Sequence, residues 1–389
     1  MMRPRQRRPG RSPLRAFVLV TALASTILIA ACTSGSTESA PGAASFDAAS
    51  QRGAYGVGVT TLELVDTTRP TEPNRSYAGA DERRLTVEVW YPAEPSDASE
   101  EQDVALDGSG APYPLIVFAH GLGGNRRQSS SYTQHLASHG YVVVSPDFPL
   151  SNIDAPGGAR LAAVVNQPGD VSFLIDRFLD FNNEAGHLLE GAIDGQKIGV
   201  TGHSLGGLTT LLTAYGDMRD PRIGAALPIA GPGCFLTANV IGDTSVPIMV
   251  LGASEDLIVT RSSVRQAYDL ANAPRYFVEL LGADHTRFAD VSLEDTQLLD
   301  ILPDILGPDI AEDALRVSEE IRGDIEACAV ETAPAGEEIL PADRQRELLR
   351  AFATPFFDAY LRGSDEAKAF LEEELAGSLP EASFEFALD

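Results

Sequence analysis

Cysteine is scarce in this sequence of 389 residues, which has three: Cys32, Cys234 and Cys328. So few cysteines exclude a disulfide-dense scaffold and the paired Cys motifs of structural zinc sites. His135 and His139 have a spacing that can bind a metal on a helix, but no third ligand lies near them in the sequence. We therefore predict neither a metal nor a cofactor.

Basic residues are also few, with 29 Lys and Arg against 56 Asp and Glu and a formal net charge of -27. A field of this sign repels phosphate backbones, so nucleic acid is excluded as a partner. No internal repeat is found, and 44% of the residues are hydrophobic, enough for one large core or two modest ones. We expect one globular domain and a monomer.

Long hydrophobic runs are missing too. The apolar stretch 16–31 has 16 residues, which is short for a membrane span, and the 15 residues before it hold six Arg and no acid. This arrangement predicts an export signal. Ile29-Ala30-Ala31-Cys32 resembles the bacterial lipobox, in which the cysteine after the cleavage point is diacylated.

We therefore predict a lipoprotein signal peptide at 1–31, a flexible tether at 32–50 and a catalytic domain at 51–389. The protein would be exported and held by lipidated Cys32 on the extracytoplasmic face of the cell membrane. A plain signal peptide with an incidental cysteine and an uncleaved anchor are the alternatives. In an oxidising exterior, Cys234 and Cys328 are either a disulfide, worth about 4 to 5 kcal/mol in the chain-entropy model, or two buried thiols.

Short apolar runs alternate with helical stretches along the rest of the chain. This alternation predicts an α/β fold with a mainly parallel eight-stranded sheet and helices on both faces. Continuously apolar runs are typical of strands buried on both faces, whereas the first two runs alternate like antiparallel edge strands. The eight runs are Val57 to Leu64, Leu85 to Tyr91, Leu115 to Ala119, Tyr141 to Ser145, Ile198 to Thr201, Ile223 to Ile229, Ile248 to Gly252 and Tyr276 to Leu281.

Residues 286–345 break this pattern, since they hold sixteen acids and four Arg, with Leu and Ile at amphipathic spacing. We expect an acidic helical insertion here. It is either a lid over the substrate pocket or a solvated appendage.

The motif Gly202-His203-Ser204-Leu205-Gly206-Gly207 follows one predicted strand and precedes a helical run. This context is typical of a nucleophile elbow, in which the two outer glycines permit a tight turn and Ser204 projects its hydroxyl. A serine needs an adjacent base, and His285 is the single histidine after Ser204. We predict His285 as the general base.

The triad acid should follow a strand at the edge where Ser204 and His285 emerge. Asp256 and Glu255 both follow the run Ile248 to Gly252; we assign Asp256 and keep Glu255 as the alternative. The oxyanion of acyl transfer needs backbone donors. We expect the N–H groups of Leu205 and of Leu122, the latter within a glycine-rich loop.

Taken together, these motifs resemble the dienelactone-hydrolase-like branch of the α/β-hydrolases, which includes platelet-activating-factor acetylhydrolases and bacterial polyester hydrolases. The resemblance spans Arg52 to Leu371. It depends on the motifs Val87-Glu88-Val89-Trp90-Tyr91-Pro92, Pro114-Leu115-Ile116-Val117-Phe118-Ala119-His120-Gly121, Gly202-His203-Ser204-Leu205-Gly206-Gly207, Gly252-Ala253-Ser254-Glu255-Asp256 and Leu281-Gly282-Ala283-Asp284-His285.

Three departures narrow what the resemblance implies. Dienelactone hydrolases use Cys where Ser204 stands, which argues against that reaction. The glycine run around Leu122 is similar to the acetylhydrolases, because polyester hydrolases usually place an aromatic residue there. In the plasma acetylhydrolases the triad acid follows the preceding strand, but here the stretch Ala226 to Cys234 holds no acid. The resemblance therefore implies Asp256 as the triad acid, as in the polyester hydrolases.

The predicted function is hydrolysis of carboxylic esters through an acyl-enzyme, with a small-molecule or lipid ester as partner, such as a phospholipid acetyl or short-chain acyl ester. A cutinase-like polyester hydrolase and a serine peptidase or amidase are alternatives. From another class, a catalytically silent, surface-tethered binding module also stays open.

Overall fold

The computed structural model describes residues 44–290, 307–325, 328, 338–375 and 377–389. The predicted signal peptide 1–31, Cys32 and most of the tether lie outside the described residues, as do parts of the predicted insertion (291–306, 326–327 and 329–337). Within the described part, no helix is both long and apolar enough to cross a membrane.

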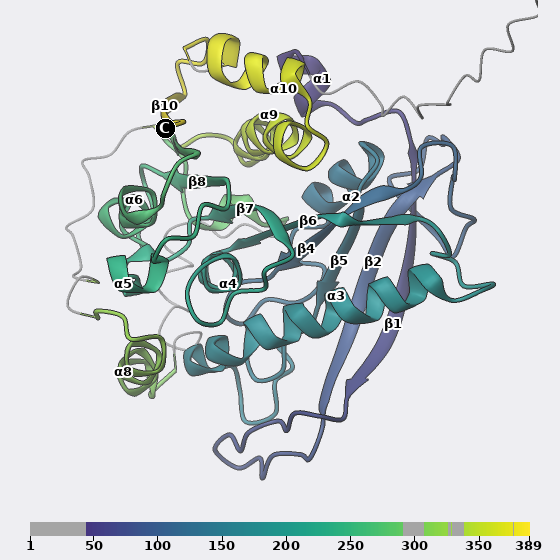
Figure 1. Ribbon diagram of the computed structural model, residues 1–389. Helices are drawn as coiled ribbons and strands as arrows, with labels where there is room; N and C mark the ends of the chain where they lie inside the picture. The colour runs from purple at the N-terminus through teal and green to yellow at the C-terminus, as the bar shows by residue number, and fades with distance from the viewer. Residues whose placement is uncertain (1–43, 291–306, 326–327, 329–337, 376) are drawn as a thin grey trace, which may run out of the picture. The chain divides into compact units, whose positions relative to one another are not determined.

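A single mixed sheet runs through the described unit (Figure 1). The strand order is β10-β9-β8-β7-β6-β4-β5-β2-β1-β3. The strands are β1 (Gly56–Asp66), β2 (Arg83–Ala93), β3 (Glu101–Gln102), β4 (Tyr113–Ala119), β5 (Val142–Pro146), β6 (Ile193–His203), β7 (Ile223–Ile229), β8 (Ile248–Ala253), β9 (Arg275–Leu280) and β10 (Ala382–Ala387).

The central strands β5, β4, β6, β7, β8 and β9 are parallel. Strand β2 is antiparallel to both β5 and β1, and β1 pairs in parallel with the short β3. Every residue of β4 is buried, whereas the middle of β1 alternates between half-buried and exposed residues. The mainly parallel α/β architecture is therefore confirmed, and all eight predicted strands are present.

The predicted number of strands is wrong, because ten strands of the described residues form the sheet. The additional β3 has two exposed residues, too few for a hydrophobic pattern. The additional β10 pairs antiparallel with β9 at the opposite edge, and its Phe384 and Phe386 contact Tyr276. The alternation of Phe384 and Phe386 with polar residues was a detectable strand signal.

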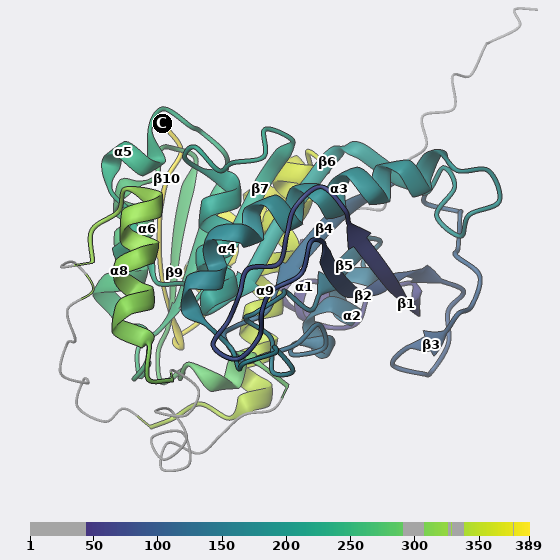
Figure 2. The ribbon, with the colours of Figure 1, turned by 90° about the horizontal axis from the view of Figure 1, so that it is seen from below.

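Helices cover both faces of the sheet (Figures 1 and 2). Alternate residues of each strand enter different cores: Leu115 and Val117 of β4 pack with α3, α4, α6 and α8, while Ile116 and Phe118 pack with α1, α2 and α9. The helices are α1 (Phe46–Ser50), α2 (Ser130–Ser138), α3 (Gln167–Asn183), α4 (Leu205–Ala214), α5 (Ala238–Ile241), α6 (Arg261–Leu270), α8 (Ile310–Ile321), α9 (Ala342–Leu361) and α10 (Asp365–Ala369), with shorter helical turns at Leu161–Asn166, Gly233–Phe235, Thr286–Phe288 and Phe370–Leu375.

The end of the predicted tether is helical, which corrects the boundary at residue 50. Ser45 caps α1 by accepting a 3.1 Å hydrogen bond from the N–H of Ala48. Ala49 is buried in the core that includes α9, and Phe46 lies beneath the guanidinium of Arg344. These contacts hold residues 46–50 on the domain.

Helix α8 is the described helix of the predicted insertion, and it packs on the domain. Val317 and Ile321 enter the core, and Arg160 forms an ion pair with Asp313, whose side chain is 1% exposed. A disulfide joins Cys234, beside α5, to Cys328, seven residues after α8 ends.

Candidate active site

Ser204 lies in a strained turn between β6 and α4. Its φ of 58° and ψ of -118° are unusual for a residue with a side chain. A Cβ added to Gly202 would lie 2.6 Å from the carbonyl oxygen of Ala119, and one added to Gly206 would lie 2.0 Å from it. Both glycines are therefore required by the close approach of β4, and the side chain of Ser204 is left partly exposed.

The structure brings His285 and Asp256 together. Asp256 follows β8 and His285 follows β9, so both come from the carboxyl edge of the parallel strands. His285 Nδ1 is 2.6 Å from Asp256 Oδ2. The other oxygen of Asp256 accepts 2.8 Å hydrogen bonds from the N–H groups of Ile258 and Val259. The carboxylate is thus fixed by backbone on one side and by imidazole on the other.

Glu255, the alternative acid, has other contacts. Its N–H donates to the carbonyl of Ala283, and its carboxylate accepts a 3.3 Å hydrogen bond from Ser254 Oγ. The side chain that faces His285 is that of Asp256.

Helix α9 holds the loop that carries His285. The buried side chain of Gln345 accepts a 3.1 Å hydrogen bond from the N–H of Asp284, and it donates a 2.7 Å hydrogen bond to the carbonyl of the same residue. The carboxylate of Asp284 accepts from the N–H groups of Thr286 and Arg287. The backbone is therefore restrained on both sides of His285.

The glycine-rich loop after β4 lies against the elbow. A Cβ added to Gly121 would lie 3.3 Å from Ser204 Cβ. The N–H of Gly123 donates to the carbonyl of Ser151, whereas the N–H groups of Leu122 and Leu205 donate to no group in the described part of the chain. These two N–H groups are the ones expected to meet an oxyanion.

His120 and His203 organise backbone beside the site. His120 is fully buried, accepts a 3.1 Å hydrogen bond from the N–H of Phe148 and lies 2.7 Å from the carbonyl of Gly121. His203 Nε2 is 2.9 Å from the carbonyl of His285. Burial lowers the pKa of His120, and burial lowers that of His203 well below its usual value, so both rings are neutral at pH 7.

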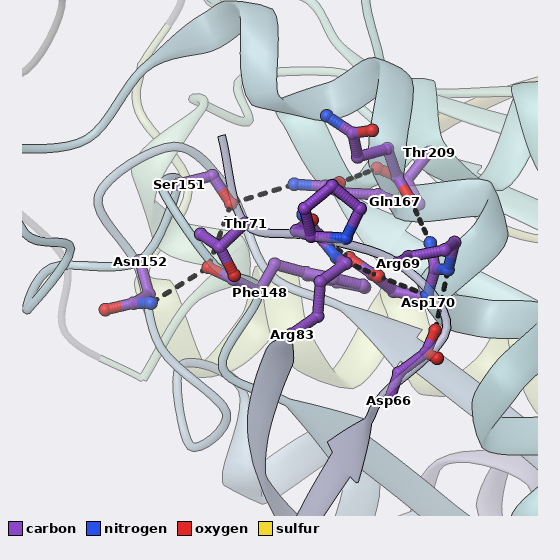
Figure 3. A network of polar contacts seen from close by, with 12 residues as sticks. Asp66, Arg69, Thr71, Arg83, Phe148, Ser151, Asn152, Gln167, Asp170 and Thr209 are labelled. Atoms are coloured by element: carbon purple, nitrogen blue, oxygen red, sulfur yellow. Dashed lines mark hydrogen bonds and ion pairs between the residues drawn. The ribbon is translucent and has the colours of Figure 1, made fainter. Parts of the chain in front are cut away.

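A buried amide connects the glycine-rich loop with the elbow helix (Figure 3). Gln167, at the start of α3, donates a 2.8 Å hydrogen bond to Ser151 Oγ. Its Oε1 accepts a hydrogen bond from Thr209, one turn into α4. The carbonyl of Ser151 accepts a hydrogen bond from the N–H of Gly123. The glycine-rich loop and α4 are therefore both connected to Gln167, the loop through Ser151 and the helix through Thr209.

The same view shows a buried ion cluster one turn further along α3 (Figure 3). Asp170 is fully buried and accepts two hydrogen bonds from Arg83, at 2.7 and 2.6 Å, and one from Arg69 at 2.8 Å. Arg69 also pairs with Asp66 at the end of β1. The cluster fixes the long β1–β2 connection against α3.

Within the described residues, no group of three or more His, Cys, Asp or Glu side chains is arranged to hold a metal ion. The glutamines Gln128, Gln167 and Gln345 could not be predicted from the sequence, because no spacing or motif signals them. Each has at least one partner that is distant in sequence, such as Asp284, which is 61 positions from Gln345.

Two family patterns match parts of the chain. Residues 107–298 match the family described as PET hydrolase-like, and residues 53–148 match platelet-activating factor acetylhydrolase, isoform II. Both matches include β4 and the glycine-rich loop after it.

Individual proteins from both groups are similar to this chain. Cutinase est2 of Thermobifida alba is 27% identical over 178 residues, which cover 44% of this chain and 53% of the cutinase. The platelet-activating factor acetylhydrolase of Bos taurus is 29% identical over 163 residues, which cover 31% of this chain and 35% of that protein. The chain thus spans about half the length of the cutinase.

Among solved structures, a ferulic acid esterase from Streptomyces cinnamoneus superposes with a TM-score of 0.57 at 23% identity. The superposition covers 85% of this chain and 96% of the esterase. At this identity the likeness establishes a shared fold.

Proposed function

Because this chain is an α/β-hydrolase related to the cutinases and the platelet-activating factor acetylhydrolases, we propose that it hydrolyses carboxylic esters with Ser204, His285 and Asp256. The observation that carries the proposal is the 2.6 Å contact between His285 Nδ1 and Asp256 Oδ2 beside a strained serine elbow. This contact leaves His285 Nε2 to act on the serine hydroxyl.

In the proposed reaction, Ser204 Oγ attacks the ester carbonyl while His285 Nε2 takes its proton. The negative oxygen of the tetrahedral intermediate accepts hydrogen bonds from the N–H groups of Leu205 and Leu122. The alcohol leaves with the proton from His285, and an acyl-enzyme remains. Water then attacks the acyl group and gives its proton to His285; the bond to Ser204 Oγ breaks, the carboxylic acid leaves, and Ser204 Oγ takes the proton back from His285. Asp256 holds the tautomer and stabilises the imidazolium.

The test is Ser204→Ala, measured on p-nitrophenyl acetate and butyrate with the purified chain. We expect the variant to lose turnover and labelling by a fluorophosphonate probe while its melting temperature stays unchanged. Full turnover by Ser204→Ala would disprove the assignment. A folded wild-type chain that the probe does not label would favour the silent binding module.

The substrate class is proposed to be a short-chain acyl or acetyl ester, because Leu122 stands where the polyester hydrolases usually carry an aromatic residue. A panel of p-nitrophenyl esters, acetylated phospholipid, polyester film and matched amides separates the alternatives. Faster release from the film than from the soluble esters would favour a polyester hydrolase. Comparable rates on the amides would favour a peptidase or amidase.

We further propose that the protein is exported and lipid-anchored through Cys32. The basic and apolar N-terminal segments and the lipobox-like sequence support this proposal, and a disulfide between Cys234 and Cys328 suits an oxidising compartment. Metabolic labelling with an alkyne fatty acid should mark the wild-type chain and not Cys32→Ala. Equal labelling of both would contradict the anchor.

A further inference from the structure

We propose that Gln128 is a positioning residue for this ester hydrolysis, because its amide connects the oxyanion loop to the loop of the base through His203. The inference goes one step beyond the proposed function and depends on it for its kinetic consequence. Gln128 lies between β4 and α2 and is in none of the motifs that predict the site.

The connection consists of three consecutive hydrogen bonds. Gln128 Oε1 accepts a 2.8 Å hydrogen bond from the N–H of Gly121, next to the predicted oxyanion donor Leu122. Gln128 Nε2 lies 2.8 Å from His203 Nδ1. His203 Nε2 in turn lies 2.9 Å from the carbonyl oxygen of His285.

The polarity of this chain of hydrogen bonds follows from its ends. The N–H of Gly121 only donates, so it must meet the amide oxygen, and the amide NH₂ then faces His203. His203 Nδ1 must therefore carry a lone pair, and Nε2 carries the proton that is donated to the carbonyl of His285. One amide thus sets the tautomer of His203.

The surroundings of His203 favour this neutral form. Its ring faces the His285 ring at 4.7 Å and the Phe288 ring at 5.9 Å, in addition to the amide of Gln128. The residue is 5% exposed, and burial lowers its pKa well below the usual value. An imidazolium would set an N–H against the NH₂ of Gln128.

A second contact connects Gln128 to the same loop. Its backbone carbonyl accepts a 2.9 Å hydrogen bond from the N–H of Asp290, five residues after His285. Gln128 therefore supports both reacting groups: the loop that meets the oxyanion and the loop that delivers the base. A displacement of about 1 Å at such a group can cost 10²-fold in rate.

The experiment compares Gln128→Met, which removes both hydrogen bonds, with His203→Phe and the double variant. We expect Gln128→Met to lower kcat on p-nitrophenyl butyrate by about 10- to 100-fold while KM stays within about threefold. The two single effects should not add, because both changes break one connection. Rates are divided by the fraction of sites that a fluorophosphonate titrates.

Gln134→Met is the matched control, because Gln134 lies on α2 and donates to Glu100, away from the site. Its kcat should equal that of the wild type. The inference is overturned if Gln128→Met keeps kcat within about twofold, or if the single effects multiply in the double variant.

Gln128→Glu is nearly isosteric and serves if the methionine variant does not fold. The glutamate keeps an acceptor for the N–H of Gly121, but it places a carboxylate oxygen, in place of the amide NH₂, opposite the lone pair of His203 Nδ1. Nitrogen NMR of the histidine-labelled chain should show a neutral Nε2–H ring at His203 in the wild type and a proton on Nδ1 in Gln128→Glu. A wild-type Nδ1–H tautomer would overturn the inference even if the chain cleaves no ester, so the two proposals fail separately.

Discussion

Two adjacent carboxylates, Glu255 and Asp256, follow β8, and the contact with His285 distinguishes them. We predict that Asp256→Asn lowers kcat by about 10³- to 10⁴-fold, because an amide no longer selects the Nδ1–H tautomer of His285. The measurement is kcat on p-nitrophenyl butyrate, with thermal melts to show that the variant is folded.

Glu255→Gln is the control for this prediction. In the wild type the Glu255 carboxylate contacts Ser254, so the kcat of Glu255→Gln should match that of the wild type. If Glu255→Gln were the slower enzyme, the acid assigned to the triad would be the wrong one.

Residues whose role follows from chain order were accessible from the sequence, and residues whose role follows from distant contacts were not. Ser204 and His285 could be proposed because each follows a strand and the serine motif is specific. Gln128 could not, because its partner His203 is 75 residues away and an amide can bond to almost any polar group.

Among the helices, α8 gives a contrast between buried and exposed ion pairs. Arg160 Nε donates to both oxygens of Asp313, at 2.9 and 2.8 Å, and that carboxylate is 1% exposed. We predict that Arg160→Met lowers the free energy of unfolding by about 3 kcal/mol, because it leaves a buried charge without its partner. Urea unfolding followed by circular dichroism measures the change.

Arg316 on the same helix supplies the matched variant. In its ion pair with Glu72, the side chains of Arg316 and Glu72 are 41% and 37% exposed. Arg316→Met should therefore lower the free energy of unfolding by less than about 1 kcal/mol. Equal losses in the two variants would mean that burial does not decide the strength of these pairs.

The same elements show where strand prediction works and where it fails. Buried strands such as β4 carry continuous apolar runs because helices cover both faces. Edge strands carry less of this pattern: β3 has two residues, and β10, which pairs with β9 alone, has no fully buried residue. The docking of α8 also depends on two ion pairs that no local pattern predicts. Arg75 pairs with Asp309, 234 residues away, and Arg160 pairs with Asp313, 153 residues away.

For the whole molecule, the disulfide closes a loop of 94 residues around α5, α6 and α8. In the chain-entropy model, removing it by Cys234→Ala with Cys328→Ala should lower the free energy of unfolding by about 4 to 5 kcal/mol. The double variant should be insensitive to dithiothreitol in a urea titration, whereas the wild type should lose a similar amount of stability on reduction. Identical wild-type curves with and without reductant would contradict the prediction.

Acid stability is a property of the whole molecule because histidines with lowered pKa values lie at two places in it: His120 and His203 beside the site, and His135 and His139 at the end of α2. Burial lowers the pKa of His120, His135, His139 and His203, whereas in the unfolded chain each has a pKa of about 6.5. Below that pH the unfolded state binds protons that the folded state does not, so the free energy of unfolding falls as the pH falls. Four such groups give a slope of up to about 5 kcal/mol per pH unit.

Urea titrations at pH 7.5, 6.5 and 5.5 measure this slope, in a range above the titration of ordinary carboxylates near pH 4. His135→Gln is the useful variant, because His135 contacts Thr354 on α9 and lies apart from the triad. Its slope should be shallower than that of the wild type by up to about 1.4 kcal/mol per pH unit, the share of one proton. A wild-type stability that is constant between pH 7.5 and 5.5 would contradict the lowered pKa values of these histidines.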